Sequence, residues 1–244
     1  MDAASGRACL LLGFARFGDR RVLWDGDIRH ACPTRIPKAH DMTTTAVLLT
    51  LLGLILGSMM FSYWIGRIIA RRDIRELGDG NPGAFNLIKT GNIPAAALGV
   101  FLDMSKGVIP IGLAVYIFGL SGAQLIPIIA APALGHAFSP FMRFKGGKAM
   151  AATGGAWIAF QPVLALTIGL AVFVGWSLIL TVSGWAIVCF AVTMLIILLV
   201  VLPDPVVIVA WVLSCALLIY KYRGDLRQPI RVRESILKRL RRTT

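Results

Sequence analysis

A short glycine-rich loop holds the residues of this sequence that are best suited to chemistry. Its core is Lys145-Gly146-Gly147-Lys148, in which two ammonium groups flank two residues that have no side chain. A phosphate that reaches such a loop can accept hydrogen bonds from backbone N–H groups and be neutralised from both flanks. The GxxxxGK(S/T) spacing of a nucleotide-binding P-loop is absent. The loop therefore predicts an anion site, and His136 upstream either faces this site or is an ordinary interfacial residue.

A second glycine-rich segment, residues 71–92, follows the first apolar run. Gly80 and Gly83 allow positive φ values, so the backbone amides around them can turn inward as an anion-binding nest. Asn81 and Asn86 add side-chain amides that both donate and accept hydrogen bonds. A plain turn between two helices is the alternative interpretation of this segment.

One ionisable pair lies inside an apolar stretch. Asp103 and Lys106 are three residues apart, so on a helix they share a face and can neutralise each other. Ionisable groups at membrane depth are costly and normally face a polar interior, where they mark a pathway or a site. The pair is therefore either a structural ion pair that orients its helix or a direct contact to a substrate.

The composition is typical of a membrane protein. Of the 244 residues, 57% are hydrophobic, whereas soluble domains average about 45–50%. Apolar runs long enough, or nearly so, to cross a hydrocarbon layer of ~30 Å cover residues 46–70, 93–120, 122–138, 149–180, 184–202 and 205–220. We predict an all-α, polytopic integral membrane helix bundle with six to seven transmembrane helices. Gln161-Pro162 and Ser183-Gly184 are the natural breaks within residues 149–202.

Charge is distributed unevenly along the chain. There are 25 Lys and Arg against 12 Asp and Glu, for a net charge of +13. Basic residues concentrate in 67–92, in 143–148 and in the tail 221–242, and the positive-inside rule places these segments on the cytoplasmic side. A basic tail beside an anionic leaflet is most often a topology signal and lipid anchor. We therefore expect the lipid bilayer, and no nucleic acid, as its partner.

These patterns divide the chain into three parts. Residues 1–41 form a polar N-terminal extension without a signal-peptide pattern, which we expect to be disordered or to precede a native start at Met42. Residues 42–222 form the transmembrane domain, and residues 223–244 form a basic cytoplasmic tail. The four cysteines have no CxxC spacing and no nearby histidine pair, so we expect no zinc site, no disulfide framework and no cofactor.

Three motifs resemble, in their order and spacing, those of a known family. The sequence reads GDGNPGAFN at 78–86, DMSKGVIP at 103–110 and GHAFSPFMRFKGGKAMAAT at 135–153. These stretches are similar to the GSGNxGAxN, DxxKGxxP and GHxFPxFxxFKGGKGVAT motifs of the acyl-phosphate-dependent glycerol-3-phosphate acyltransferases of bacteria, the PlsY family. The similarity extends from about Leu54 to Tyr222, and the third motif is long and specific.

The resemblance implies an acyltransferase of phospholipid synthesis in the bacterial inner membrane. Its expected reaction transfers a fatty acyl group from acyl phosphate to the 1-hydroxyl of glycerol 3-phosphate, giving lysophosphatidic acid and phosphate. Because the mixed anhydride is already activated, no acyl-enzyme intermediate is needed. The protein must chiefly align two anions and stabilise the carbonyl oxygen as it gains charge.

The resemblance also implies roles for individual residues. Lys145 and Lys148 would be catalytic by neutralising charge, with Lys148 meeting glycerol 3-phosphate, and His136 would support the loop. Two asparagines and a glycine of the first motif would shape the donor pocket. The implied substrate-binding residues are Asp79, Gly80, Asn81, Gly83, Asn86, Lys89, Lys106, Gly146, Gly147 and Ser183.

Several positions depart from the family pattern, and five of them bear on the expected activity. Asp79 replaces a serine and Lys89 an arginine, while Ala186, Tyr222 and Asp225 replace a serine, a histidine and an asparagine. A carboxylate at position 79 would repel a donor phosphate by about 4 kcal/mol at about 4 Å with an effective dielectric constant of about 20. We hypothesise that Asp79 forms a salt bridge with Lys89. The alternative function is that of a catalytically degenerate paralogue, which binds lipids or anions in the membrane or transports a phosphorylated molecule.

Overall fold

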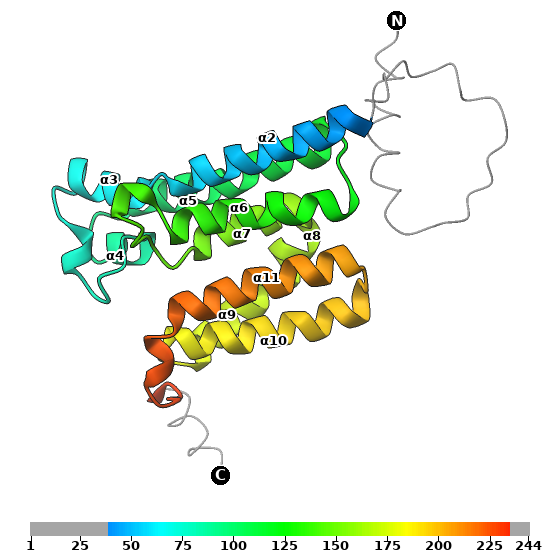
Figure 1. The fold of residues 1–244 in the computed structure, drawn as a ribbon. Helices are drawn as coiled ribbons and strands as arrows, with labels where there is room; N and C mark the ends of the chain where they lie inside the picture. The colour runs from blue at the N-terminus through cyan, green and yellow to red at the C-terminus, as the bar shows by residue number, and fades with distance from the viewer. Residues whose placement is uncertain (1–38, 235–244) are drawn as a thin grey trace, which may run out of the picture. The chain divides into compact units, whose positions relative to one another are not determined.

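The computed structural model describes residues 39–234, which form a bundle of helices (Figure 1). Regular structure in this range is helical, apart from an isolated bridge between Leu180 and Val232. The longer helices are α2 (Ala39–Ser58), α3 (Phe61–Ile68), α5 (Ile93–Gly112), α6 (Leu125–Ala137), α7 (Met150–Phe160), α9 (Leu170–Ile179), α10 (Ser183–Val201) and α11 (Pro205–Tyr222). The short elements used below are η2 (Ile74–Glu76), α4 (Ala84–Ile88), η5 (Pro140–Met142), α8 (Pro162–Leu164) and η6 (Ala165–Gly169).

The predicted all-α class is therefore confirmed. The predicted N-terminal extension lies outside the described residues, except for residues 39–41, which belong to α2. Residues 235–244 of the predicted tail also lie outside them.

Within the described range, six helical segments are long and apolar enough to span a membrane. They are Met42–Ile68, Ile93–Ile117, Gly122–Met142, Pro162–Ile179, Ser183–Val201 and Pro205–Tyr222. The helix α7 is apolar but shorter, at 11 residues. Both predicted breaks are confirmed, because α7 ends before Gln161 and α10 begins at Ser183. The number of spans agrees with the lower of the two predicted figures.

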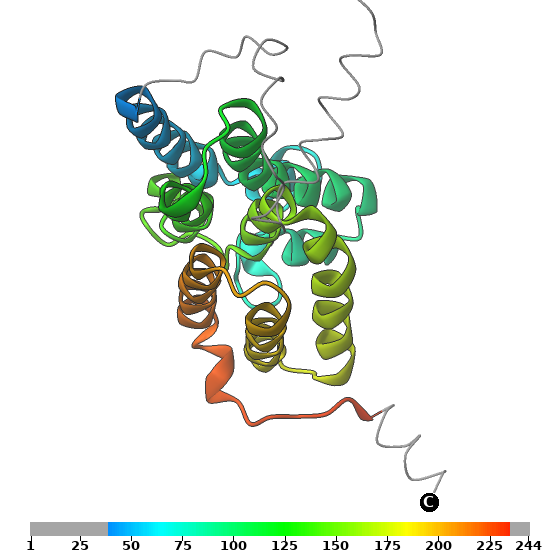
Figure 2. The same cartoon turned by 90° about the vertical axis from the view of Figure 1, so that its right-hand side faces the viewer.

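The helices pack in two groups, which Figure 2 shows with the helices seen end-on. In the first group α2 contacts α6, α5 contacts α7, and α6 also contacts α7. In the second group α10 contacts both α9 and α11. The contact between α11 and α6 joins the two groups.

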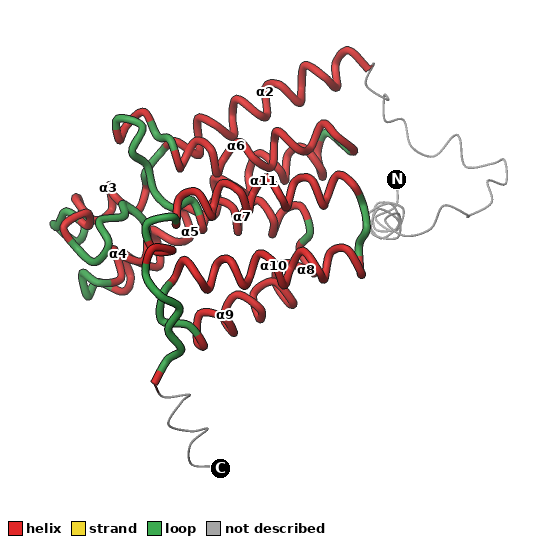
Figure 3. The backbone as a smooth tube through the Cα atoms, turned by 60° about the horizontal axis from the view of Figure 1, so that its bottom comes forward, coloured by secondary structure: helices red, strands yellow, loops and turns green. Residues whose placement is uncertain are grey.

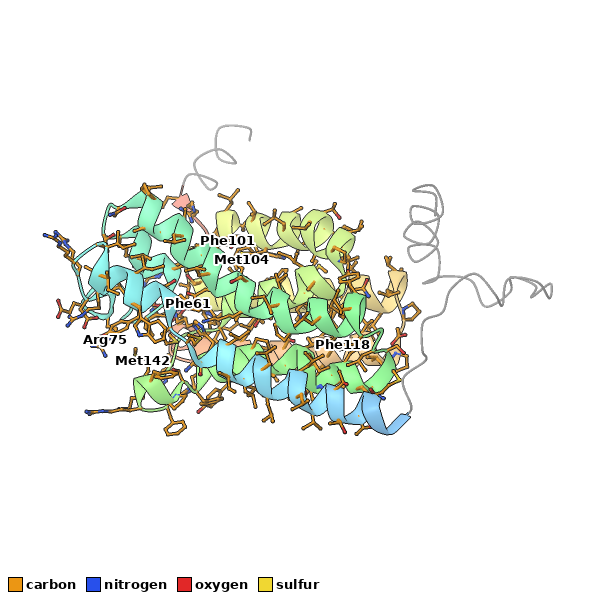
Figure 4. The ribbon with its side chains drawn as sticks, turned by 90° about the horizontal axis from the view of Figure 1, so that it is seen from above. Phe61, Arg75, Phe101, Met104, Phe118 and Met142 are labelled. Carbon is orange, nitrogen blue, oxygen red and sulfur yellow. The ribbon has the colours of Figure 1, made fainter. Side chains whose placement is uncertain are left out.

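The segments that carry the sequence motifs gather at one end of the bundle. Figure 3 shows much of the loop structure, in green, at the end where α3 and α4 lie. Figure 4 labels Arg75 and Met142 at this end and Phe118 at the opposite end. Because α5 and α7 begin at this end while α6 and α11 finish there, segments far apart in the sequence meet. We call it the motif end.

The first span is interrupted between α2 and α3. Met60 has φ −98° and ψ 69°, which is not helical. Irregular backbone at membrane depth is tolerated where other protein groups satisfy the freed polar atoms. Here Ser139 Oγ donates to Ser58 O at 2.6 Å, and Lys106 Nζ donates to Met59 O at 2.8 Å. The interruption therefore supplies acceptors to buried polar residues of other helices.

Glycines allow α5 and α7 to approach closely, as small residues do at helix contacts in membranes. A Cβ added at Gly107 would lie 2.2 Å from Ala152 O, and one added at Gly155 would lie 2.0 Å from Met104 O. Backbone atoms are the obstacle in both cases, so a side chain at either position requires the helices to separate.

We expect Gly155→Ala to destabilise the bundle by about 1–3 kcal/mol, because its methyl group meets backbone. The neighbouring Gly154 has open space at its Cβ position. Gly154→Ala is therefore the matched control, and we expect it to be neutral or stabilising by about 0.5–1 kcal/mol. Thermal unfolding in detergent measures both, and equal unfolding temperatures would contradict the packing described here.

Candidate active site

Lys148 lies at the centre of the polar groups at the motif end. Its Nζ is 2.8 Å from Asp79 Oδ2, and it donates to both carboxylate oxygens of Asp225, at 2.8 and 3.0 Å. The same ammonium group lies 4.4 Å from the centre of the Tyr222 ring, a cation–π contact. One lysine thus joins the KGGK loop to the GDGN segment and to the end of α11.

Two asparagines connect the same segments. Asn81 Oδ1 accepts a hydrogen bond from the Lys148 backbone N–H at 3.0 Å. Asn86 Nδ2 donates to Asp79 Oδ1 and to Asn81 O, both at 2.9 Å. Asn86 is buried and does not line the cavity described below, so it acts on the site by holding Asp79 and Asn81 in place.

The hypothesised salt bridge between Asp79 and Lys89 is wrong. Asp79 pairs with Lys148 instead, while Lys89 Nζ lies beside Gly78, where an added Cβ would be 1.9 Å from it. Partial burial raises the pKa of the Asp79 carboxyl, but the hydrogen bond and charge of Lys148 outweigh burial and hold the pKa below its ordinary value. The pair is therefore charged at neutral pH. Its stabilisation is lost only as the pH falls through the lowered pKa.

The backbone amides of the KGGK loop are largely used by the protein, contrary to the prediction that they are free for phosphate. Gly147 N donates to His136 O at 3.1 Å, and the Lys148 amide is bound to Asn81. The first turn of α7, which begins at Met150, has no side-chain cap, and a helix leaves its first N–H groups without internal partners. Amides that can bind an anion therefore lie just after Lys148.

The glycines of the loop serve close packing. A Cβ at Gly146 would lie 2.0 Å from His136 O, and one at Gly147 would lie 2.3 Å from His136 Nε2. Neither position tolerates a side chain, because the loop lies directly against the end of α6.

A buried cluster of charged and polar groups lies beneath the loop. Lys106 Nζ donates to Asp103 Oδ1 at 2.8 Å and lies 2.7 Å from His136 Nδ1. Ser62 Oγ donates to Asp103 Oδ2. Asp103 and Lys106 are each only 1% exposed, so their charges must be balanced by one another. The predicted pairing of Asp103 with Lys106 is confirmed. The ammonium group of Lys106 does not reach the cavity lining.

An apolar cavity of about 400 Å³ extends from the motif end into the bundle. Its polar end is lined by Asn81, Gly83, Asp103, His136, Lys148 and Tyr222. Its deeper walls include Met104, Trp157, Phe173, Phe190 and Trp211. Tyr222 and Trp211 both lie on α11, and at 1.5 Å per residue they are about 16 Å apart. One leaflet of hydrocarbon is about 15 Å deep, half of the ~30 Å core, so the cavity has the length of a fatty chain.

The cavity is open on one side along its length. Phe85, Ile88, Leu166 and Leu170 line it and are themselves exposed. These apolar side chains border the opening of the cavity.

The comparisons with known proteins agree with this geometry. The family model described as glycerol-3-phosphate acyltransferase matches residues 47–231. The chain belongs to the glycerol-3-phosphate acyltransferase family. A glycerol-3-phosphate acyltransferase of Bacillus velezensis is 32% identical over 78% of this chain and 97% of its own length. A glycerol-3-phosphate acyltransferase of Enterococcus faecalis is 38% identical over 48% of this chain. The match covers 53%, about half, of that relative's length.

Two solved structures of this family have the same fold. Both are crystal structures of the integral membrane glycerol 3-phosphate acyltransferase PlsY. The glycerol 3-phosphate form is 31% identical, with a TM-score of 0.66, and the lysophosphatidic acid form is 29% identical, with a TM-score of 0.67. Each match covers 75% of this chain and 90% of the other. The resemblance seen in the three motifs is confirmed, and the chain is a multi-pass membrane protein.

Not all of the predicted site residues meet. Lys145 and Ser183 are exposed and do not line the cavity, and Lys89 is also exposed. Gly80 has a φ of 73° and lies in an exposed turn. The residues that the structure does bring together are Asp79, Asn81, Gly83, Asn86, His136, Gly146, Gly147 and Lys148.

Lys221 is a residue of the site that sequence reasoning missed. Its Nζ donates to Ala137 O at 2.8 Å and to Gly146 O at 3.0 Å, so it fastens the loop to the end of α6. It also lies 5.5 Å from the centre of the Phe138 ring. The only signal in the sequence was a lysine at the start of the basic tail, where a topology role explains it equally well.

Proposed function

We propose that the protein transfers a fatty acyl group from acyl phosphate to the 1-hydroxyl of glycerol 3-phosphate, releasing phosphate and lysophosphatidic acid. One observation carries the proposal. A cation, Lys148, and the uncapped first turn of α7 lie at the polar end of an apolar cavity as long as a fatty chain. An amphiphile with an anionic head group fits both parts.

The reaction needs alignment and charge neutralisation rather than a covalent intermediate. The hydroxyl oxygen of the acceptor attacks the acyl carbonyl carbon, and the bond from this carbon to the phosphate oxygen breaks. The hydroxyl proton leaves with the released phosphate. Two anionic substrates repel one another, so a cation between them lowers the cost of bringing them together. Lys148 is the cation that faces the cavity among the described residues.

Sidedness follows from the charges. Arg75, Arg143 and Arg223 belong to segments at the motif end, whereas the described loop between α10 and α11 carries Asp204 and no basic residue. The positive-inside rule supports a motif end on the cytoplasmic side of a bacterial inner membrane. Glycerol 3-phosphate, which is soluble, would reach the site from that side.

A second function, that of a lipid- or anion-binding paralogue without catalysis, is favoured by one observation. The charge of Lys148 is already met by two carboxylates, Asp79 and Asp225. A phosphate must displace at least one of them before it can bind the amine directly.

The first test is phosphate release from palmitoyl phosphate and glycerol 3-phosphate by the purified protein in lipid. We expect Lys148→Ala to lower kcat/KM by about 10²–10³, because a preorganised charged donor is lost. Lys145→Ala is the matched control, since Lys145 is exposed away from the cavity, and we expect a change below about threefold. Equal effects of the two substitutions would contradict the proposal, and an inactive parent protein would favour the second function.

The second test concerns the carboxylates. We expect Asp79→Ser and Asp225→Asn each to lower the KM for glycerol 3-phosphate by about five- to tenfold, because each removes a competitor for the Lys148 amine. Asp204→Asn is the control, since Asp204 caps α11 at the opposite end and asparagine also caps helices. Steady-state kinetics measure the effect, and a raised KM in both variants would show that the carboxylates assist binding.

A further inference from the structure

We propose that His136 acts on the substrate as a neutral hydrogen-bond donor through Nε2, and that Lys106 is the positioning residue that fixes this tautomer. The inference rests on the proposed function, because it assigns a role within that reaction. It changes the role predicted for Lys106, from a substrate ligand to a group that acts through another side chain.

Lys106 makes three polar contacts that together fix the His136 tautomer. Its Nζ has three acceptors, which are Asp103 Oδ1 at 2.8 Å, Met59 O at 2.8 Å and His136 Nδ1 at 2.7 Å. An ammonium group has three N–H donors and no lone pair. Each donor therefore has one partner, and His136 Nδ1 can take part only as an acceptor.

The charges of the buried cluster balance one another. Asp103 is 1% exposed and also accepts from Ser62 Oγ, so it is surrounded by donors. A buried carboxylate needs a cation, and Lys106 is the group in ion-pair distance of it. Lys106 is thus charged and His136 is neutral, because a second cation in contact with the ammonium group would be uncompensated. The ring proton of His136 lies on Nε2.

The Nε2 edge of the His136 ring lies beside Gly147. A Cβ added at Gly147 would lie 2.3 Å from His136 Nε2 and 3.1 Å from Asn81 Oδ1. Gly147 therefore packs directly against the edge of the ring that carries Nε2, and His136 also lines the large cavity. No described residue forms a hydrogen bond with Nε2. A donor without a protein partner, at the polar end of the cavity, suits an oxygen of the ligand.

The tautomer excludes one role and favours another. With Nδ1 held by Lys106 and Nε2 protonated, the imidazole has no free lone pair, so it cannot be the base that removes the hydroxyl proton. A preorganised N–H donor instead stabilises an oxygen that gains charge during the reaction. We assign His136 Nε2–H to the carbonyl oxygen of the acyl donor.

Two substitutions of His136 separate donor from base. Glutamine can place an N–H group near the position of Nε2 but cannot act as a base, whereas alanine can do neither. We expect His136→Ala to lower kcat by about 10²–10³ and His136→Gln to stay within about tenfold of the parent. If His136→Gln is as inactive as His136→Ala while both proteins remain folded, the donor role is overturned.

Nitrogen NMR tests the role of Lys106 without turnover. The protein has three histidines, so ¹⁵N-labelled histidine gives few signals, and the His136→Gln spectrum identifies that of His136. We expect a neutral ring protonated at Nε2 in the parent. In the charge-balanced double variant Asp103→Asn with Lys106→Met, we expect a mixture of tautomers. A parent ring protonated at Nδ1 would refute the inference.

The two measurements also separate this inference from the proposed function. An inactive parent protein would count against acyl transfer, whereas the tautomer would still be read from the spectrum. In that case a shift of the Nε2 signal on addition of palmitoyl phosphate supports donation to the ligand, and an unchanged signal contradicts it.

Discussion

The rest of the site depends on the ammonium group of Lys148. This group lies where the apolar cavity meets the polar end of the bundle. Its Nζ is held by Asp79, which precedes the loop in the sequence, and by Asp225, which follows it. A single charge therefore organises three segments, and in the proposed function it also binds the phosphate of the substrate. The two tasks compete, because the carboxylates that order the empty site occupy the position that a phosphate would take. In the proposed function, this exchange sets the affinity of the site for phosphate.

The buried cluster of Asp103, Lys106 and His136 supports the loop from beneath. In the apolar interior every charge and every freed carbonyl needs a partner, since water does not supply one. The interruption between α2 and α3 leaves Met59 O free, and Lys106 uses it together with Asp103 and His136. Because all three N–H groups of Lys106 have partners, the orientation of the His136 ring is fixed. The glycines of the loop then let it lie directly on the ring.

Much of the fold could be predicted from the sequence, because hydrophobic length and local breaks are local properties. The helical class, the break at Gln161 and the pairing of Asp103 with Lys106 all depend on neighbours within a few residues. The partner of Asp79 could not be predicted in this way. The sequence contains both Lys89 and Lys148, and only the packing of the loop decides which of them the carboxylate meets.

The amides of the KGGK loop illustrate the same limit of local reasoning. Glycines beside lysines are typical of anion sites, yet here the Gly147 and Lys148 amides bind His136 O and Asn81 Oδ1. The free amides belong instead to the first turn of α7, and only the start of that helix reveals them. The role of Lys221 could not be predicted for a related reason: its partners are backbone carbonyl groups, which the sequence does not distinguish from any others.

The most direct measurement is an experimental structure of the protein in lipid with bound lysophosphatidic acid. We expect the phosphate within about 3 Å of Lys148 Nζ, with at least one of the two aspartates released, and the acyl chain along Trp157 and Phe190 inside the cavity. A lysolipid bound elsewhere, with Lys148 still paired to both Asp79 and Asp225, would contradict this expectation.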